Sequence, residues 1–124
     1  MCQVKLNVPT DSETIFVDFA KARKRVFEEK EKDDGARTLR VVLEKALERI
    51  ASQNGVNLND FGEISRLNDH LKKEGKISKV MWEENKTYIA IGNSAAHGDY
   101  DEYDMKQVEN FYRYIQSLID KYIG

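Results

Sequence analysis

An asparagine and a histidine stand four residues apart in the segment AIGNSAAHG, residues 90–98. On a helix this spacing places Asn93 and His97 on one face. An imidazole can accept or donate a proton near neutral pH, and a carboxamide can orient a polar ligand, so the pair is a candidate for acid–base chemistry. The alternative is structural, because a histidine in the last turn of a helix can also bind the free carbonyl groups there.

The residues beside this pair are small: Gly92, Ser94, Ala95 and Ala96. Small side chains let a second backbone or a ligand come close, so this set predicts a helix-packing or interface surface. Glycine inside a helix costs up to about 1 kcal/mol relative to alanine. We therefore expect something to press against Gly92, or the helix to bend there.

Acidic residues follow in the segment DYDEYD, residues 99–104. Alternate carboxylates are typical of the start of a calcium loop, but the glycine and the later glutamate of an EF-hand are missing. Cys2 is the only cysteine and the chain has two histidines, which argues against a closed zinc site. No metal site is predicted, and the acids are expected to serve the start of the last helix.

Apolar residues recur every three or four positions in five stretches, which predicts five helices. Thr10 and Glu13 form a capping box for the first, which is expected to run to about Lys30. Asp34 is expected to cap the second helix, which ends near Gly55.

The third helix is expected over residues 61–71, before Gly75, and the fourth begins near Ser78 and continues into residues 90–98. Asp104 and Gln107 form a capping box for the last. These elements predict an all-α fold, a helical bundle of four to five helices in one domain, residues 1–124. Within this domain, residues 1–9 form a short extended N-terminal arm, either a strand or an ordered arm.

Composition narrows the class of protein. With 40% hydrophobic and 34% charged residues the chain is expected to be globular, and it shows neither a signal peptide nor a membrane-spanning run. A cytoplasmic protein without a membrane partner is the expectation. The net charge of −2 does not indicate a nucleic-acid binder. Arg37 and Arg40 belong either to an evenly charged helix surface or to a local phosphate-binding face.

A family resemblance rests on three segments in order: RTLRVVLEKALERIA, LKKEGKISKVMWEENKTYIAI and GNSAAHG. Together they resemble the HEPN superfamily (higher eukaryotes and prokaryotes nucleotide-binding domains), particularly an uncharacterised bacterial branch with a G-N-x-A-A-H-G signature. The similarity covers about residues 37–98, and the terminal helices match by pattern alone.

The resemblance implies a chemistry. Many members of that superfamily are metal-independent endoribonucleases of toxin–antitoxin and antiphage systems, in which two subunits join their motifs in a symmetric cleft. The motif combines an arginine, a polar residue and a histidine. The polar residue corresponds to Asn93 and the histidine to His97, while the arginine position falls on Gly92. Arg37 or Arg40 of the second helix is then the candidate source of a guanidinium.

We therefore expect a HEPN-like binding or regulatory module, dimeric and catalytically degenerate, that engages RNA, a nucleotide or a protein partner from the same defence system. No cofactor is expected. Two alternatives stay open. One is an active endoribonuclease that uses His97 and Asn93, and the other is an accessory interaction domain of a restriction-type protein.

Overall fold

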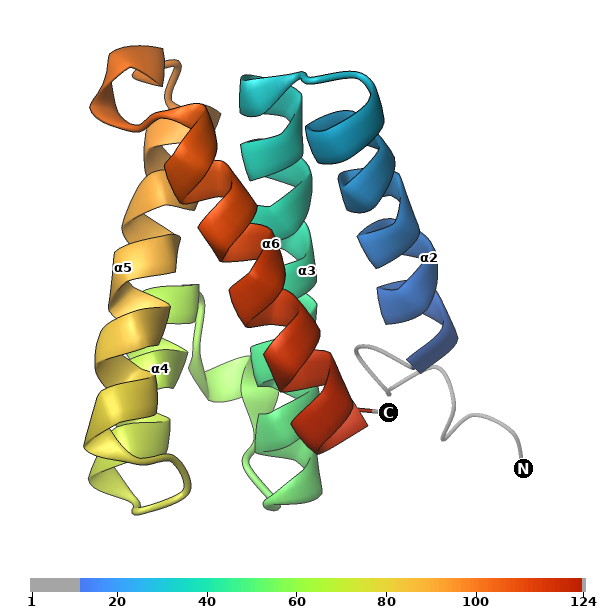
Figure 1. Ribbon diagram of the computed structural model, residues 1–124. Coiled ribbons are helices and arrows are strands. Elements are labelled where there is room, and N and C mark those ends of the chain that lie inside the picture. The colour runs from blue at the N-terminus through green and yellow to red at the C-terminus, as the bar shows by residue number, and fades with distance from the viewer. Residues whose placement is uncertain (1–11, 124) are drawn as a thin grey trace.

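The computed structural model describes residues 12–123 and shows an all-α bundle (Figure 1). This confirms the predicted fold class, while the arm at residues 1–9 and the Thr10 cap lie outside the described residues. The five α-helices are α2 (Ser12–Arg23), α3 (Lys32–Gln53), α4 (Ile64–Lys73), α5 (Lys79–Ala96) and α6 (Met105–Leu118). Two π-helical segments, η1 (Lys24–Glu28) and η4 (Ile119–Ile123), and two 3-10 turns, η2 (Leu58–Asp60) and η3 (Tyr100–Glu102), join or extend them.

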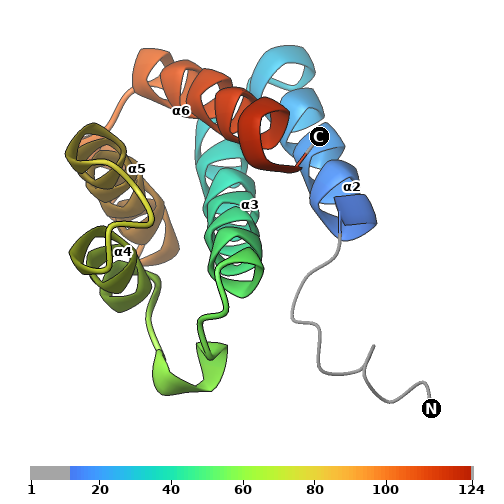
Figure 2. The same cartoon turned by 90° about the horizontal axis from the view of Figure 1, so that it is seen from below.

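Helix α3 lies in the middle of the bundle. Seen from below, α2 flanks it on one side, α4 and α5 flank it on the other, and α6 crosses a third side (Figure 2). Apolar residues every three or four positions along α3 fill this centre, because that spacing keeps them on one side of the helix. At most 1% of each is exposed: Leu39, Val42, Leu43, Ala46, Leu47 and Ile50. Among residues 12–123, no helix crosses the side of α3 that faces away from α6 (Figure 2).

Local signals set most of the helix ends. The Asp104–Gln107 capping box is present, with each side chain accepting the other's backbone N–H at 2.8 Å. Ser78 caps α5 by accepting the backbone N–H of Met81 at 3.1 Å. The prediction that Asp34 caps the second helix was wrong, because α3 begins two residues earlier with Glu31 as its N-cap. Asp34 lies in the first turn of α3, where the helix dipole stabilises a negatively charged carboxylate.

A network of buried polar groups holds the three helices α4, α5 and α6 together. The carboxamides of Asn68 on α4 and Asn85 on α5 are both fully buried. Asn85 donates to Asn68 at 2.8 Å, Asn68 donates to the carbonyl oxygen of Trp82 at 3.1 Å, and the Tyr114 hydroxyl of α6 donates to Asn85. Because each of these buried groups has a hydrogen-bond partner, the network avoids the free-energy cost of unsatisfied polar atoms.

The buried hydrogen-bond network of Asn68, Asn85 and Tyr114 makes the fold sensitive to alkaline pH. Burial raises the pKa of Tyr114 above its usual value near 10, so the folded state keeps the hydroxyl neutral while the unfolded chain ionises. The stability that Tyr114 contributes is complete below about pH 10 and is lost as the pH rises above it. Chemical denaturation of wild type and Tyr114→Phe at rising pH should show a shallower alkaline loss in the variant, and parallel curves would contradict this.

Candidate functional site

Helix α5 ends at the segment that carries Asn93 and His97. His97 is its C-cap, and its backbone N–H donates to the carbonyl oxygen of Asn93 at 2.9 Å. Gly98 then takes a φ of 81°, a left-handed conformation that glycine adopts at little cost and that stops the helix. The His97 side chain is exposed and that of Asn93 is half-buried. Both side chains line the same hollow, so the four-residue spacing brings them together.

Arg40 of α3 reaches this pair across Gly92. A Cβ atom added at Gly92 would lie 2.8 Å from both Cβ and Cγ of Arg40 and 3.0 Å from its Cδ. The aliphatic part of Arg40 therefore lies directly against the backbone of α5, in space that any side chain at position 92 would fill. From there the Arg40 Nε–H donates to Oδ1 of Asn93 at 3.1 Å. The hydrogen bond uses one of the five guanidinium donors.

The hollow in front of these residues has a volume of about 260 Å³. Arg40, Asn93 and His97 line one side of it. The start of α4 lines the other, where the backbone N–H groups of the first turn have no partner within the helix and Glu63 supplies no side-chain cap. The full lining is Arg40, Glu44, Gly62, Glu63, Ile64, Ser65, Asn93 and His97. Hydrogen-bond donors thus line both sides of the hollow, together with the carboxylates of Glu44 on α3 and Glu63 just before α4.

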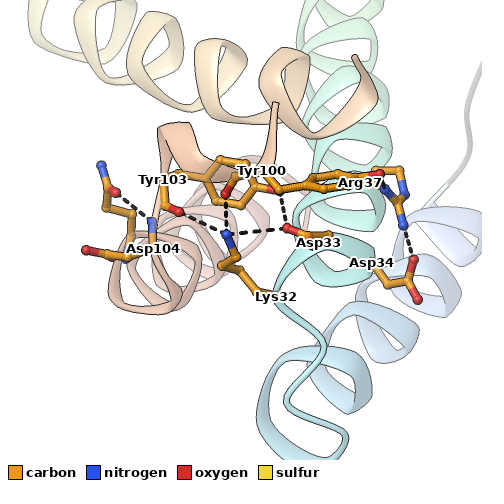
Figure 3. A network of polar contacts seen from close by, with 8 residues as sticks. Lys32, Asp33, Asp34, Arg37, Tyr100, Tyr103 and Asp104 are labelled. Atoms are coloured by element: carbon orange, nitrogen blue, oxygen red, sulfur yellow. Dashed lines mark hydrogen bonds and ion pairs between the residues drawn. The ribbon is translucent and has the colours of Figure 1, made fainter. Parts of the chain in front are cut away.

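The other arginine proposed from the sequence lies elsewhere. Arg37 donates to the hydroxyl of Tyr100 at 2.9 Å and forms an ion pair with Asp34, as Figure 3 shows. These two hydrogen bonds are the main cause that raises the pKa of Arg37 above its ordinary value. The structure therefore joins Arg40, and not Arg37, to Asn93.

The small residues of α5 divide between two environments. Gly92 and Ala95 are buried against the bundle, Ser94 is half-buried, and Ala96 is exposed. The close approach of Arg40 is made at Gly92. The four residues therefore do not share one face.

An unpredicted set of contacts holds the loop that follows His97. The Lys32 ammonium group, at the start of α3, donates to the carbonyl oxygen of Tyr103 at 3.1 Å and also to that of Tyr100 (Figure 3). The Tyr103 hydroxyl donates to Asp33 at 2.6 Å, and burial raises the pKa of Tyr103. The only signal in the sequence was the pair of tyrosines among the acids, which does not identify a partner about 70 residues away.

Two findings limit the chemistry of the part of the chain that the structure describes. Within residues 12–123, no three His, Cys, Asp or Glu side chains come together as a group that could hold a metal ion. In the same range, none of the helices has the length and apolar character needed to cross a bilayer.

Comparison with known protein families, curated proteins and solved structures found no match for this chain.

The contact at Gly92 gives a direct test of the site's packing. Gly92→Ala should destabilise the protein, because the overpacking cost of about 1–3 kcal/mol exceeds the gain in helix propensity of up to about 1 kcal/mol. Gly62→Ala is the matched control, since an added Cβ there meets nothing within 4 Å. Urea denaturation measures both, and equal stability of the two variants would contradict the close approach of α3 and α5.

Proposed function

We propose that this chain is a HEPN-like RNA-binding domain, and that the hollow between α3, α5 and the start of α4 binds a phosphate group of the RNA. The observation that carries the proposal is the hydrogen bond from Arg40 to Asn93 over Gly92, beside His97. In the resemblance the arginine position falls on Gly92. Here the aliphatic part of Arg40, from the neighbouring helix, occupies the space above that glycine and carries the guanidinium to Asn93.

The chemistry of the hollow suits an oxyanion. A guanidinium is permanently charged and presents several donors in a plane, which matches the oxygens of a phosphate. The unpaired N–H groups at the start of α4 add partial positive charge. Glu44 and Glu63 disfavour an anion close to their carboxylates, so the favoured position for a phosphate is next to the Arg40 guanidinium and His97.

An active metal-independent endoribonuclease is the second candidate, and the exposed His97 side chain at the same hollow favours it. In that reaction His97 takes the proton of a ribose 2′-hydroxyl, and the 2′-oxygen attacks the adjacent phosphorus. The 5′-oxygen leaves with a proton from the solvent or a protonated side chain, and a 2′,3′-cyclic phosphate remains. Arg40 would stabilise the charge on the phosphate during this step.

The proposal extends to assembly and biological setting through the resemblance. A homodimer would bring two such hollows together, and a toxin–antitoxin or phage-defence system would supply a protein partner. As an accessory domain of a restriction-type protein, the chain would bind nucleic acid without cleaving it. A monomer at micromolar concentration in light scattering would contradict the dimer.

Loss of the guanidinium tests binding. Arg40→Met keeps an unbranched side chain over Gly92 and removes the charge, so it should weaken binding of a labelled RNA oligonucleotide by about tenfold, or about 1.4 kcal/mol. Arg113→Met is the matched control, because Arg113 is exposed on α6. Fluorescence anisotropy measures both. The phosphate site is refuted if the two variants bind RNA equally well.

Loss of the imidazole separates the two candidate functions. RNA is incubated with wild type and His97→Ala in the presence of a chelator, and cleavage products are resolved on a gel. Cleavage by wild type alone, with RNA affinity retained in the variant, would establish the endoribonuclease and rule out a degenerate domain. If wild type binds RNA and the RNA stays intact, the binding module is the function that is supported.

A further inference from the structure

We propose that the RNA ligand is a single strand that continues from the Asn93–His97 hollow across the exposed face of α3 into a second hollow between α2 and α3. This inference rests on the proposed function of the first hollow. The second hollow has a volume of about 370 Å³ and is lined by Lys21 and Arg25 of α2 and by Arg37 and Val41 of α3, among others.

The two hollows lie on either side of α3 on its open face. Arg40 lines the first hollow and Arg37 the second, and the two are three residues apart, so they are neighbours on the helix surface. Val41, 39% exposed, lies next to them. Helix α6 crosses the opposite side of α3, and no other helix of the described residues crosses the face between the hollows (Figure 2).

Uncompensated positive charge in the second hollow points to an anionic ligand. Its two carboxylates already have partners, because Asp18 pairs with Lys45 at 2.5 Å and Asp34 pairs with Arg37. Arg25 donates to the neutral hydroxyl of Thr38 at 2.7 Å. Among the described residues no carboxylate pairs with Lys21 or Arg25, so both cations are available to phosphates.

An exposed aromatic ring contacts a residue that lines the second hollow. Tyr100 follows His97 by three residues and is 40% exposed. Arg37 donates to its hydroxyl and lies 5.7 Å from the ring centroid, so the ring is held against a cation that lines the second hollow (Figure 3). Single-strand binding proteins combine such a ring, on which a base stacks, with cations that follow the backbone.

Acidic residues set the direction of the strand. Glu44 and Glu48 lie one and two turns beyond Arg40 on α3 and line a third, smaller hollow. The charge of Glu44 disfavours phosphates on the part of the open face beyond Arg40, which leaves the path across the part that carries Arg37 and Arg40. A strand on this path must bend over α3. A flexible single strand can do so, whereas a duplex with a persistence length of about 50 nm cannot.

The test compares a dinucleotide, which fits the first hollow alone, with a decanucleotide that reaches both. Binding of labelled single-stranded RNA is measured by anisotropy over a range of salt concentrations for the full chain, Lys21→Ala and Lys106→Ala. Lys106 is an exposed lysine on α6 and serves as the matched control. Lys21→Ala should weaken decanucleotide binding several-fold and lower the slope of log Kd against log salt concentration by about 0.7, the value for one phosphate contact. Dinucleotide binding should not change.

Tyr100 provides an independent readout. Tyr100→Ala should weaken decanucleotide binding by roughly fivefold or more, while Tyr100→Phe, which keeps the ring, should not. The path is overturned if Lys21→Ala behaves like Lys106→Ala, or if duplex RNA binds as well as the single strand, and dinucleotide binding would then still support the first hollow. If wild type binds neither oligonucleotide, the proposed function falls as well.

Discussion

The burial of α3 on three sides is the constraint on which the rest of the structure depends. A helix surrounded in this way must present apolar residues to α2, α5 and α6, and the fully buried leucines and valines of α3 meet that demand. Only one side remains for polar residues. Arg37 and Arg40 lie on that side, and from there the Arg40 guanidinium reaches Asn93 at the polar end of α5.

The two ends of the bundle are held by different physical means. Below the site, buried carboxamides and a tyrosine hydroxyl are satisfied by one another and fix α4, α5 and α6 in one register. Above it, Lys32 binds backbone carbonyl oxygens of the loop that follows α5. A ligand in the hollow would thus meet helices whose positions are already fixed, which lowers the entropy lost on binding.

The sequence predicts this fold well where the responsible forces are local. The Asp104–Gln107 box and the Ser78 cap depend on residues three positions apart, and apolar spacing alone indicates five helices. Asp34 failed as a cap because α3 already begins at Lys32, after an N-cap residue, Glu31, whose side chain makes no capping hydrogen bond. The contact of Arg40 with Asn93 joins residues 53 positions apart, and its existence depends on how two helices pack. Spacing along the chain carries no information about that choice between Arg37 and Arg40.

The glycine at position 92 can be explained only together with Arg40, its neighbour on α3. The volume that a side chain would occupy there is filled from the opposite helix, so the two positions share one space. An arginine at 92 facing a small residue at 40 would deliver a guanidinium to the same hollow from the other wall. Related chains should therefore covary at these two positions, with the charge conserved in space while the helix that carries it changes.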